Sequence, residues 1–169
     1  FSPWSQRVPF LLSWPGHLDA GTVNDELAAG IDLGPTLGDL CGVAVPAGEG
    51  RSLVSGPEPD HLLAAIGYGL PGVAAMAMIE KGFWSDGGGW PQRLCVRTRR
   101  WRYDRSTRRE GETLGPEEFD AFLADCDADP REERNVLDDN APVAAPMETI
   151  VAAAHAAAPQ ILGGGWVRP

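Results

Sequence analysis

The stretch WSQRVPFLLSWPGHLDAGTVNDELAAGIDLGPTLGDLCGVAVPAGEGRSL, residues 4–53, says most about how this chain folds. It opens with an apolar run, Val8–Trp14, in which polar residues are almost absent. Continuous apolar runs of this length are typical of buried strands, and Pro15-Gly16 directly after the run is a strong turn signal. We therefore predict a buried strand that ends in a turn.

A short helix is predicted in the second part of the same stretch. Asp32 precedes an apolar segment that carries Pro35 early and Gly42 just past its last apolar residue. An acidic cap, an early proline and a terminal glycine together indicate a helix over residues 33–41. The Gly-, Pro- and acid-rich segment 46–60 that follows is predicted to be a loop and a domain boundary.

The rest of the chain contains further strands and a long helix. Residues 61–68 and 93–104 are predicted strands, 117–124 is a helix or a strand, and 125–130 is an acidic turn. The pattern over residues 69–81 fits either a helix or a strand, and residues 83–91 are predicted to be a Gly-rich loop. No role is predicted for residues 69–91. Apolar residues at helical spacing predict a terminal helix over 142–158, and the end of the chain, 163–169, is expected to be a loose tail.

Composition and charge exclude several classes of function. Hydrophobic residues make up 43% of the 169, which indicates a globular protein, and the net charge of −10 argues against nucleic-acid binding. The basic run 97–105 is interleaved with aromatic residues, but it is better explained as a half-buried strand. No apolar run is long enough to span a membrane and no signal peptide is present, so localisation is not predicted.

Three cysteines, Cys41, Cys95 and Cys126, are an odd number without metal-ligand spacing. We expect each to be a small buried side chain. Three acids at alternate positions, Asp125, Asp127 and Asp129, resemble the start of a calcium loop. Pro130 and Val136 stand where such a loop needs Gly and Glu, so a solvated turn is expected.

The histidines and isolated acidic residues do not form a recognisable group of catalytic residues in the sequence. His17, His61 and His155 each lack a second ligand or an acid partner at a telling spacing, and structural roles are expected for all three. Asp86, in the Gly-rich loop, is the one further carboxylate considered. We therefore name no catalytic residue and no metal ligand in this chain, and no substrate-binding residue can be named.

Six short motifs occur in an order that resembles the sulfatase family, after its active-site residues. In the first half they are Arg7-Val8-Pro9 with Trp14-Pro15-Gly16, Ile31–Leu37, Leu40–Val43 and Gly50–Leu53. In the second half they are Arg97–Tyr103 and Phe122–Val136. Arg7 could pair with a carboxylate near the parent's site, but a structural ion pair is the expected role.

The resemblance implies an α/β fold. Residues 1–56 would form the C-terminal edge of an alkaline-phosphatase-like α/β catalytic domain. Residues 57–162 would form the C-terminal subdomain, a small antiparallel sheet packed by a C-terminal helix, and 163–169 a tail. Such a chain, taken alone, should leave strand edges and apolar surface exposed and be poorly stable.

The implied function is that of a C-terminal fragment of a sulfuric ester hydrolase. In the family, calcium and a formylglycine carry the chemistry, and both are expected in the full-length parent and not in this chain. The formylglycine arises in a C/S-x-P/A-x-R motif, which Cys95-Val96-Arg97-Thr98-Arg99 lacks at its third position.

The expected partners are an N-terminal catalytic domain, in cis or in trans, and a small sulfate ester. Two alternatives stay open. One is a non-catalytic module from a split or decayed gene, and the other is a phosphonate or phosphate ester hydrolase of the same superfamily.

Overall fold

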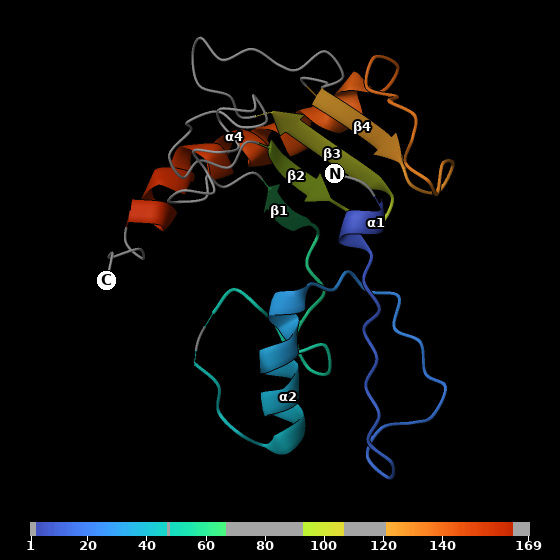
Figure 1. Cartoon of the computed structure of the whole chain (residues 1–169), viewed down its shortest axis with the longest axis vertical. Helices are drawn as coiled ribbons and strands as arrows, with labels where there is room; N and C mark the ends of the chain where they lie inside the picture. Colours follow the sequence, from blue (N-terminus) through green and yellow to red (C-terminus); the bar gives the residue numbers. More distant parts are fainter. Residues whose placement is uncertain (1–2, 47, 67–92, 107–120, 164–169) are drawn as a thin grey trace, which may run out of the picture. The chain divides into compact units, whose positions relative to one another are not determined.

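The computed structural model describes residues 3–46, 48–66, 93–106 and 121–163 (Figure 1). The chain divides into two compact units. The N-terminal unit comprises residues 3–62, and the C-terminal unit begins at Leu63. The functional boundary expected after residue 56 stays a prediction.

The N-terminal unit is built mostly from loops. Its elements are the short helix α1 (Pro3–Gln6), the 3-10 turn η1 (Gly30–Asp32) and the helix α2 (Leu33–Cys41). The predicted helix over 33–41 is thereby confirmed. Gly42 ends it in the left-handed conformation with φ +65°, and its N–H bonds back to the carbonyls of Gly38 and Asp39.

The prediction of a buried strand over Val8–Trp14 was wrong. No strand is assigned there, and Val8 and Leu11 keep 70% and 90% of their surface exposed. A strand needs a neighbour to accept its backbone hydrogen bonds, and no described strand pairs with this segment. The turn after it is confirmed, since Gly16 has φ +82° and the His17 N–H donates to the Trp14 carbonyl.

The C-terminal unit contains a four-stranded sheet in the order β1 (Leu62–Ile66), β2 (Arg93–Arg97), β3 (Trp101–Ser106) and β4 (Ala121–Asp125). Both β2 with β3 and β3 with β4 pair antiparallel. The helix α4 (Ala141–Gly163) packs on one face of this sheet (Figure 1). The predicted antiparallel sheet with its C-terminal helix is confirmed.

The single strand predicted over 93–104 is in fact a hairpin. Residues 98–100 form its turn, where the Thr98 N–H donates to the Trp101 carbonyl and the Trp101 N–H donates to Thr98 Oγ1. The threonine hydroxyl thus replaces a backbone partner and lets the chain reverse within a run that has no glycine or proline. The segment left open at 117–124 contains β4, a strand, from Ala121 onward. Residues 69–91 and the tail 164–169 lie outside the described residues.

The hydrophobic core lies between the sheet and α4. Alternate residues of the three antiparallel strands point to this face, and one side of α4 covers them. The buried members are Leu94, Val96, Tyr103, Leu123, Ala144, Met147 and Val151. Because strand side chains alternate, the other face of the sheet carries a different set, which includes charged side chains.

Candidate functional site

The opposite face of the sheet holds a network of buried ion pairs. Arg102 and Asp104 alternate on β3 with the core residue Tyr103 and are each only 2% exposed. Arg102 forms a salt bridge with Asp104 and donates through Nε to Glu132 Oε2 at 2.6 Å. Its guanidinium also lies 4.7 Å from the centre of the Phe122 ring on β4. The arginine therefore joins two strands and the segment after β4.

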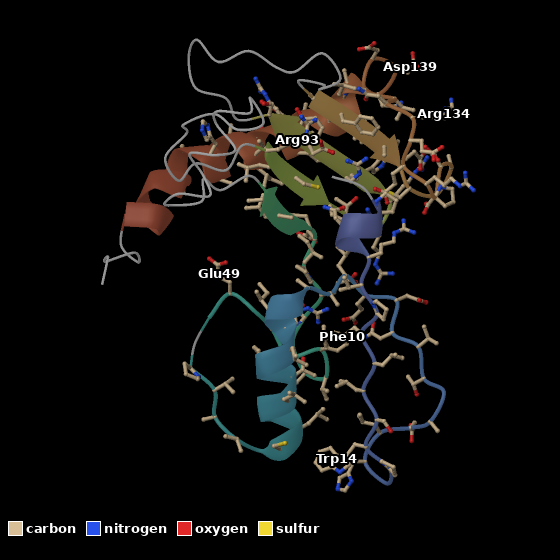
Figure 2. The ribbon with its side chains drawn as sticks, viewed as in Figure 1. Phe10, Trp14, Glu49, Arg93, Arg134 and Asp139 are labelled. Atoms are coloured by element: carbon tan, nitrogen blue, oxygen red, sulfur yellow. The ribbon has the colours of Figure 1, made fainter. Side chains whose placement is uncertain are left out.

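Two arginines of β2 extend this network. Arg93 pairs with Asp104, and Arg97 Nη1 donates to Glu132 Oε1 at 2.7 Å. Figure 2 shows Arg93 on this face of the sheet. Each carboxylate is thus held by two guanidinium groups, which offset the cost of removing its charge from water.

Glu132 is the least expected member of the network. Its φ is +55°, a conformation that is rare for a residue with a Cβ atom, and only 4% of its surface is exposed. Burial raises the pKa of its carboxyl, but the hydrogen bonds and charges of Arg97 and Arg102 outweigh burial and leave that pKa lowered. A carboxylate stabilised in this way is a poor general acid or base at neutral pH. The network therefore has a structural role: it fixes the backbone around Glu132 against the strands β2 and β3.

The acidic turn after β4 has local structural partners. Asp125 pairs with Arg100 Nη2 at 2.7 Å, and this hydrogen bond is the main reason why its pKa is lowered. Asp129 accepts the N–H groups of Glu133 and Arg134, and the hydrogen bond from the Arg134 N–H contributes most to lowering the pKa of its carboxyl. No helical segment begins at this turn. The two acids thus stabilise the turn itself.

The N-terminal unit contains a second polar cluster, which connects α2 to the Gly50–Leu53 loop. Asp32 is buried, and its carboxylate accepts the N–H of Ala29 at 2.8 Å and that of Arg51 at 2.9 Å. The sequence predicted that the Asp32 side chain caps α2. It makes no capping hydrogen bond, because its carboxylate binds the backbone N–H groups of two loop residues instead. Thr36 Oγ1 donates to the Asp32 carbonyl and accepts the N–H of Leu53 at 3.0 Å.

Arg51 completes this cluster on the loop side. Its Nη1 donates to the Gly56 carbonyl and its Nη2 donates to Glu26 Oε2, both at 2.8 Å. Gly50 is required beside it, because a Cβ atom there would clash with the Ile31 carbonyl oxygen. Ser52 and Ser55 donate to the exposed carboxylate of Asp39 on α2, and the hydrogen bond from the Ser52 hydroxyl contributes most to lowering the pKa of that carboxyl. The conformation of this loop thus depends on α2.

The histidines and cysteines considered from sequence lie apart from these clusters. His17 stacks on Trp14 with ring centres 4.0 Å apart, and Trp14 is at the turn end of the extended segment (Figure 2). His61 and His155 are half-buried, and Arg7 is exposed. Cys95 and Cys126 are buried as predicted, whereas Cys41 at the end of α2 is exposed. Asp86 lies outside the described residues.

Neither a cysteine in a formylglycine motif nor a group of possible metal ligands is found among the residues that the structure describes. None of the three cysteines stands in a C/S-x-P/A-x-R sequence, so none is a source of formylglycine. In the part of the chain that the structure describes, no three His, Cys, Asp or Glu side chains are grouped so that they could hold a metal ion. Among those same residues, no helix is long and apolar enough to cross a bilayer.

Sequence reasoning missed part of these clusters. Asp104 was not singled out, although it alternates with apolar residues on a strand that also carries Arg102. The left-handed conformation of Glu132 had no sequence signal, because that conformation usually falls on glycine or asparagine.

Comparison with known proteins supports the resemblance on which the sequence motifs depend. Residues 3–60 match the family model described as N-sulphoglucosamine sulphohydrolase, C-terminal. The matched residues include the Asp32, Thr36 and Arg51 cluster. None of the curated proteins matches the sequence of this chain.

A solved structure shares the fold of this chain. A Bacteroides thetaiotaomicron protein from work on the metabolism of multiple glycosaminoglycans is 22% identical with a TM-score of 0.57, over 77% of this chain and 26% of that one. A 2-O GAG sulfatase is 22% identical with a TM-score of 0.44, over 79% of this chain and 25% of its own. This chain therefore spans about a quarter of the length of these structures. The resemblance to the C-terminal portion of sulfatases is confirmed.

Proposed function

We propose that this chain is the C-terminal part of a sulfatase-like sulfuric ester hydrolase and that it supports a catalytic domain located N-terminal to it. The observation that carries this proposal is the match of residues 3–60 to a sulfatase C-terminal family model. The two polar clusters, around Glu132 and around Asp32, are consistent with this proposal, because their side chains bind one another and backbone groups and so stabilise the fold.

The chemistry would come from the preceding domain. That domain would contribute the formylglycine and the calcium ion, since the described residues of this chain contain no group of three possible metal ligands. A metal ion would offset the charge of the sulfate oxygens, and the hydrated aldehyde would supply the nucleophile. The role of the present chain would be to bury the flank of that domain and to hold loops in place.

For the substrate we propose a sulfated sugar. The matching family model is described by its action on N-sulphoglucosamine, and the first structural neighbour comes from work on glycosaminoglycans. A phosphate or phosphonate ester remains the alternative substrate within the superfamily, because a tetrahedral oxyanion needs similar electrostatic stabilisation. The other alternative is a non-catalytic module.

The test compares the 169-residue chain with a polypeptide extended upstream of Phe1 in the same reading frame. Both would be assayed with calcium on an aryl sulfate, on glucosamine N-sulfate and on an aryl phosphate. We expect sulfate release by the extended form only. Preferred hydrolysis of the phosphate would favour the alternative hydrolase, and inactivity of both forms on every substrate would favour the module.

A matched set of variants tests where the nucleophile resides. Cys41→Ala, Cys95→Ala and Cys126→Ala in the extended polypeptide should each retain sulfate release, since none of these thiols lies in a formylglycine motif. Loss of activity in one of them, with the fold intact by circular dichroism, would contradict the assignment of the chemistry to the preceding domain.

A further inference from the structure

The strand β4 has one backbone edge that faces away from the rest of the sheet. Among the described strands, β4 is the last in the sheet order. The Cys126 N–H donates to the Arg100 carbonyl, so the even-numbered residues of β4 bond to β3. Because backbone groups alternate along a strand, the odd-numbered residues Ala121, Leu123 and Asp125 direct theirs away from β3. We call this side of the strand the β4 edge.

The side chain of Asn135 occupies the middle of the β4 edge. Its Oδ1 accepts the Leu123 N–H at 3.0 Å, and its Nδ2 donates to the Ala121 carbonyl at 3.1 Å. Val136, next in the chain, donates its backbone N–H to the Leu123 carbonyl at 2.9 Å. The preceding residue, Arg134, is labelled beside β4 in Figure 2. A side-chain amide has the donor and the acceptor of a peptide group, so Asn135 takes the place of part of a further strand.

The turn after β4 brings Asn135 back to this strand. The Asp125 carbonyl accepts the N–H of Asp129 at 2.8 Å, which closes the C-terminal end of the β4 edge. The carboxylate of Asp129 in turn accepts the N–H groups of Glu133 and Arg134. The chain is thereby folded back on β4 immediately before Asn135.

The segment that closes the edge also has its own backbone groups bonded to side chains. The Val136 carbonyl accepts from Asn140 Nδ2 at 2.9 Å, and the Leu137 N–H donates to Asn135 Oδ1 at 3.2 Å. The backbone ladder of the sheet therefore ends at two side-chain amides, and a side chain does not extend a sheet as a strand does.

The sequence of β4 shows why such closure matters. Residues 121–124 are uncharged and apolar, and β4 contains neither lysine nor proline, which commonly keep an edge strand from pairing. An open β4 edge could pair with the same edge of a second copy, antiparallel about Leu123. Ala121 would then lie opposite Asp125 of the other copy, so the two Asp125 carboxylates would stay apart.

We propose that Asn135 keeps this chain from joining a second copy through β4, because its amide occupies the positions that the backbone of the other copy would take. The second copy is the occupant that the edge itself favours, since pairing about Leu123 satisfies the same groups on both sides. The inference does not depend on the proposed function.

The experiment compares the 169-residue chain with Asn135→Ala by sedimentation velocity and by amide hydrogen exchange. Both are measured over about a hundredfold range of protein concentration, in about 0.15 M salt to screen repulsion between acidic copies. The Leu123 amide of the native chain should exchange slowly at every concentration. In Asn135→Ala it should exchange about tenfold faster at low concentration, because its acceptor is lost. At high concentration it should slow again while the sedimentation coefficient rises above that of the native chain.

Three further variants separate the causes. Asn135→Leu has nearly the shape of asparagine without its polar groups, and it provides the same test if the alanine variant does not fold. Asn135→Asp keeps an acceptor for the Leu123 N–H and adds a charge that opposes a second copy of a chain with net charge −10. It should sediment as the native chain does. Arg134→Ala, which changes an exposed neighbour, should leave both measurements unchanged.

Two results would overturn the inference. In a folded Asn135→Ala or Asn135→Leu variant, one is native sedimentation together with Leu123 exchange that does not depend on concentration, because the opened edge would then not pair. The other is a rise in the sedimentation coefficient without renewed protection of the Leu123 amide, because the contact between copies would then lie away from β4.

Discussion

Glu132 combines features that are individually unfavourable. A residue with a Cβ atom loses about 1–2 kcal/mol in the left-handed conformation, and burial of a carboxylate adds to that cost. The two arginines that bind its carboxylate, Arg97 and Arg102, come from adjacent strands. The residue is therefore stable only when the hairpin of β2 and β3 has formed, and it ties the segment after β4 to that hairpin.

Replacing Glu132 tests this account. Glu132→Gln keeps the shape of the side chain but leaves two buried guanidinium groups without a counter-charge. We expect the free energy of unfolding to fall by roughly 3 kcal/mol at neutral pH, as measured by urea denaturation. The adjacent exposed Glu133→Gln is the control and should change stability by less than about 0.5 kcal/mol. Equal effects of the two variants would contradict a structural role for the network.

The same residue predicts a pH dependence. The pKa of the Glu132 carboxyl lies below its ordinary value of 4.5 in the folded chain. Its stabilising contribution is therefore complete above about pH 4.5 and is lost as the pH falls through the folded-state pKa. The stability difference between the native chain and Glu132→Gln should shrink as the pH is lowered from 6 toward 3. A difference that stays constant over this range would rule out ionisation as its source.

At the scale of elements, α2 and the Gly50–Leu53 loop form one polar unit. Asp32 and Thr36 lie four residues apart, so both face the loop and bind backbone N–H groups of Arg51 and Leu53. This explains physically why an Asp, a Thr and a Gly-Arg-Ser-Leu sequence occur together in the matched family region.

Gly50→Ala should disrupt this unit. The added Cβ atom would overlap the Ile31 carbonyl, so the loop must move, at a cost of about 1–3 kcal/mol. Hydrogen exchange of the Arg51 and Leu53 amides should become faster, because their acceptors are Asp32 at the end of η1 and Thr36 on α2. Gly48→Ala meets no atom within 4 Å and is the matched control. Unchanged exchange in Gly50→Ala would mean that the loop does not depend on close contact with Ile31.

A second contact between secondary-structure elements is the packing of α4 on the sheet. Met147 is 5% exposed within the core, whereas Thr149 lies on the exposed side of the same helix. Met147→Ala should lower the free energy of unfolding by about 2–5 kcal/mol because it leaves a cavity. Thr149→Ala should have little effect. Similar urea midpoints for the two variants would contradict the assignment of this face as the core.

At the scale of the whole molecule, the two units differ in how well they bury apolar surface. The C-terminal unit has a core between sheet and helix, while the N-terminal unit exposes most of its large apolar side chains. The apolar exposure expected from sequence is present in the structure. The low stability expected for the isolated chain stays a prediction.

We expect the 169-residue chain to bind an apolar fluorescent dye without denaturant. Replacing both Leu33 and Leu37 by serine should reduce the fluorescence and lower the unfolding free energy by roughly 2–3 kcal/mol, since the two side chains are 42% and 43% exposed and so a little more than half buried. Ala152→Ser is the control and should leave the fluorescence unchanged. Dye binding that the double variant does not reduce would place the accessible apolar surface elsewhere.

Local signals in the sequence were sufficient for the elements whose interactions are local. The helix from Leu33 to Cys41 follows from Pro35 and Gly42, and the terminal helix follows from its apolar spacing, because both are specified by nearby residues. The order of six motifs indicated the sulfatase C-terminal portion. The same order predicts that the nucleophile motif lies outside this chain, and this stays a prediction.

Only the tertiary structure decided the rest, because it depends on contacts between distant residues. Val8–Trp14 has the composition of a buried strand, but a strand forms only where a neighbour supplies hydrogen bonds. The reversal at Thr98 was hidden in a run that reads as one strand. Asp32 serves a loop nineteen residues away, and Glu132 binds arginines at least thirty residues away. Such partners follow from the way strands and loops meet in space, and no local pattern encodes them.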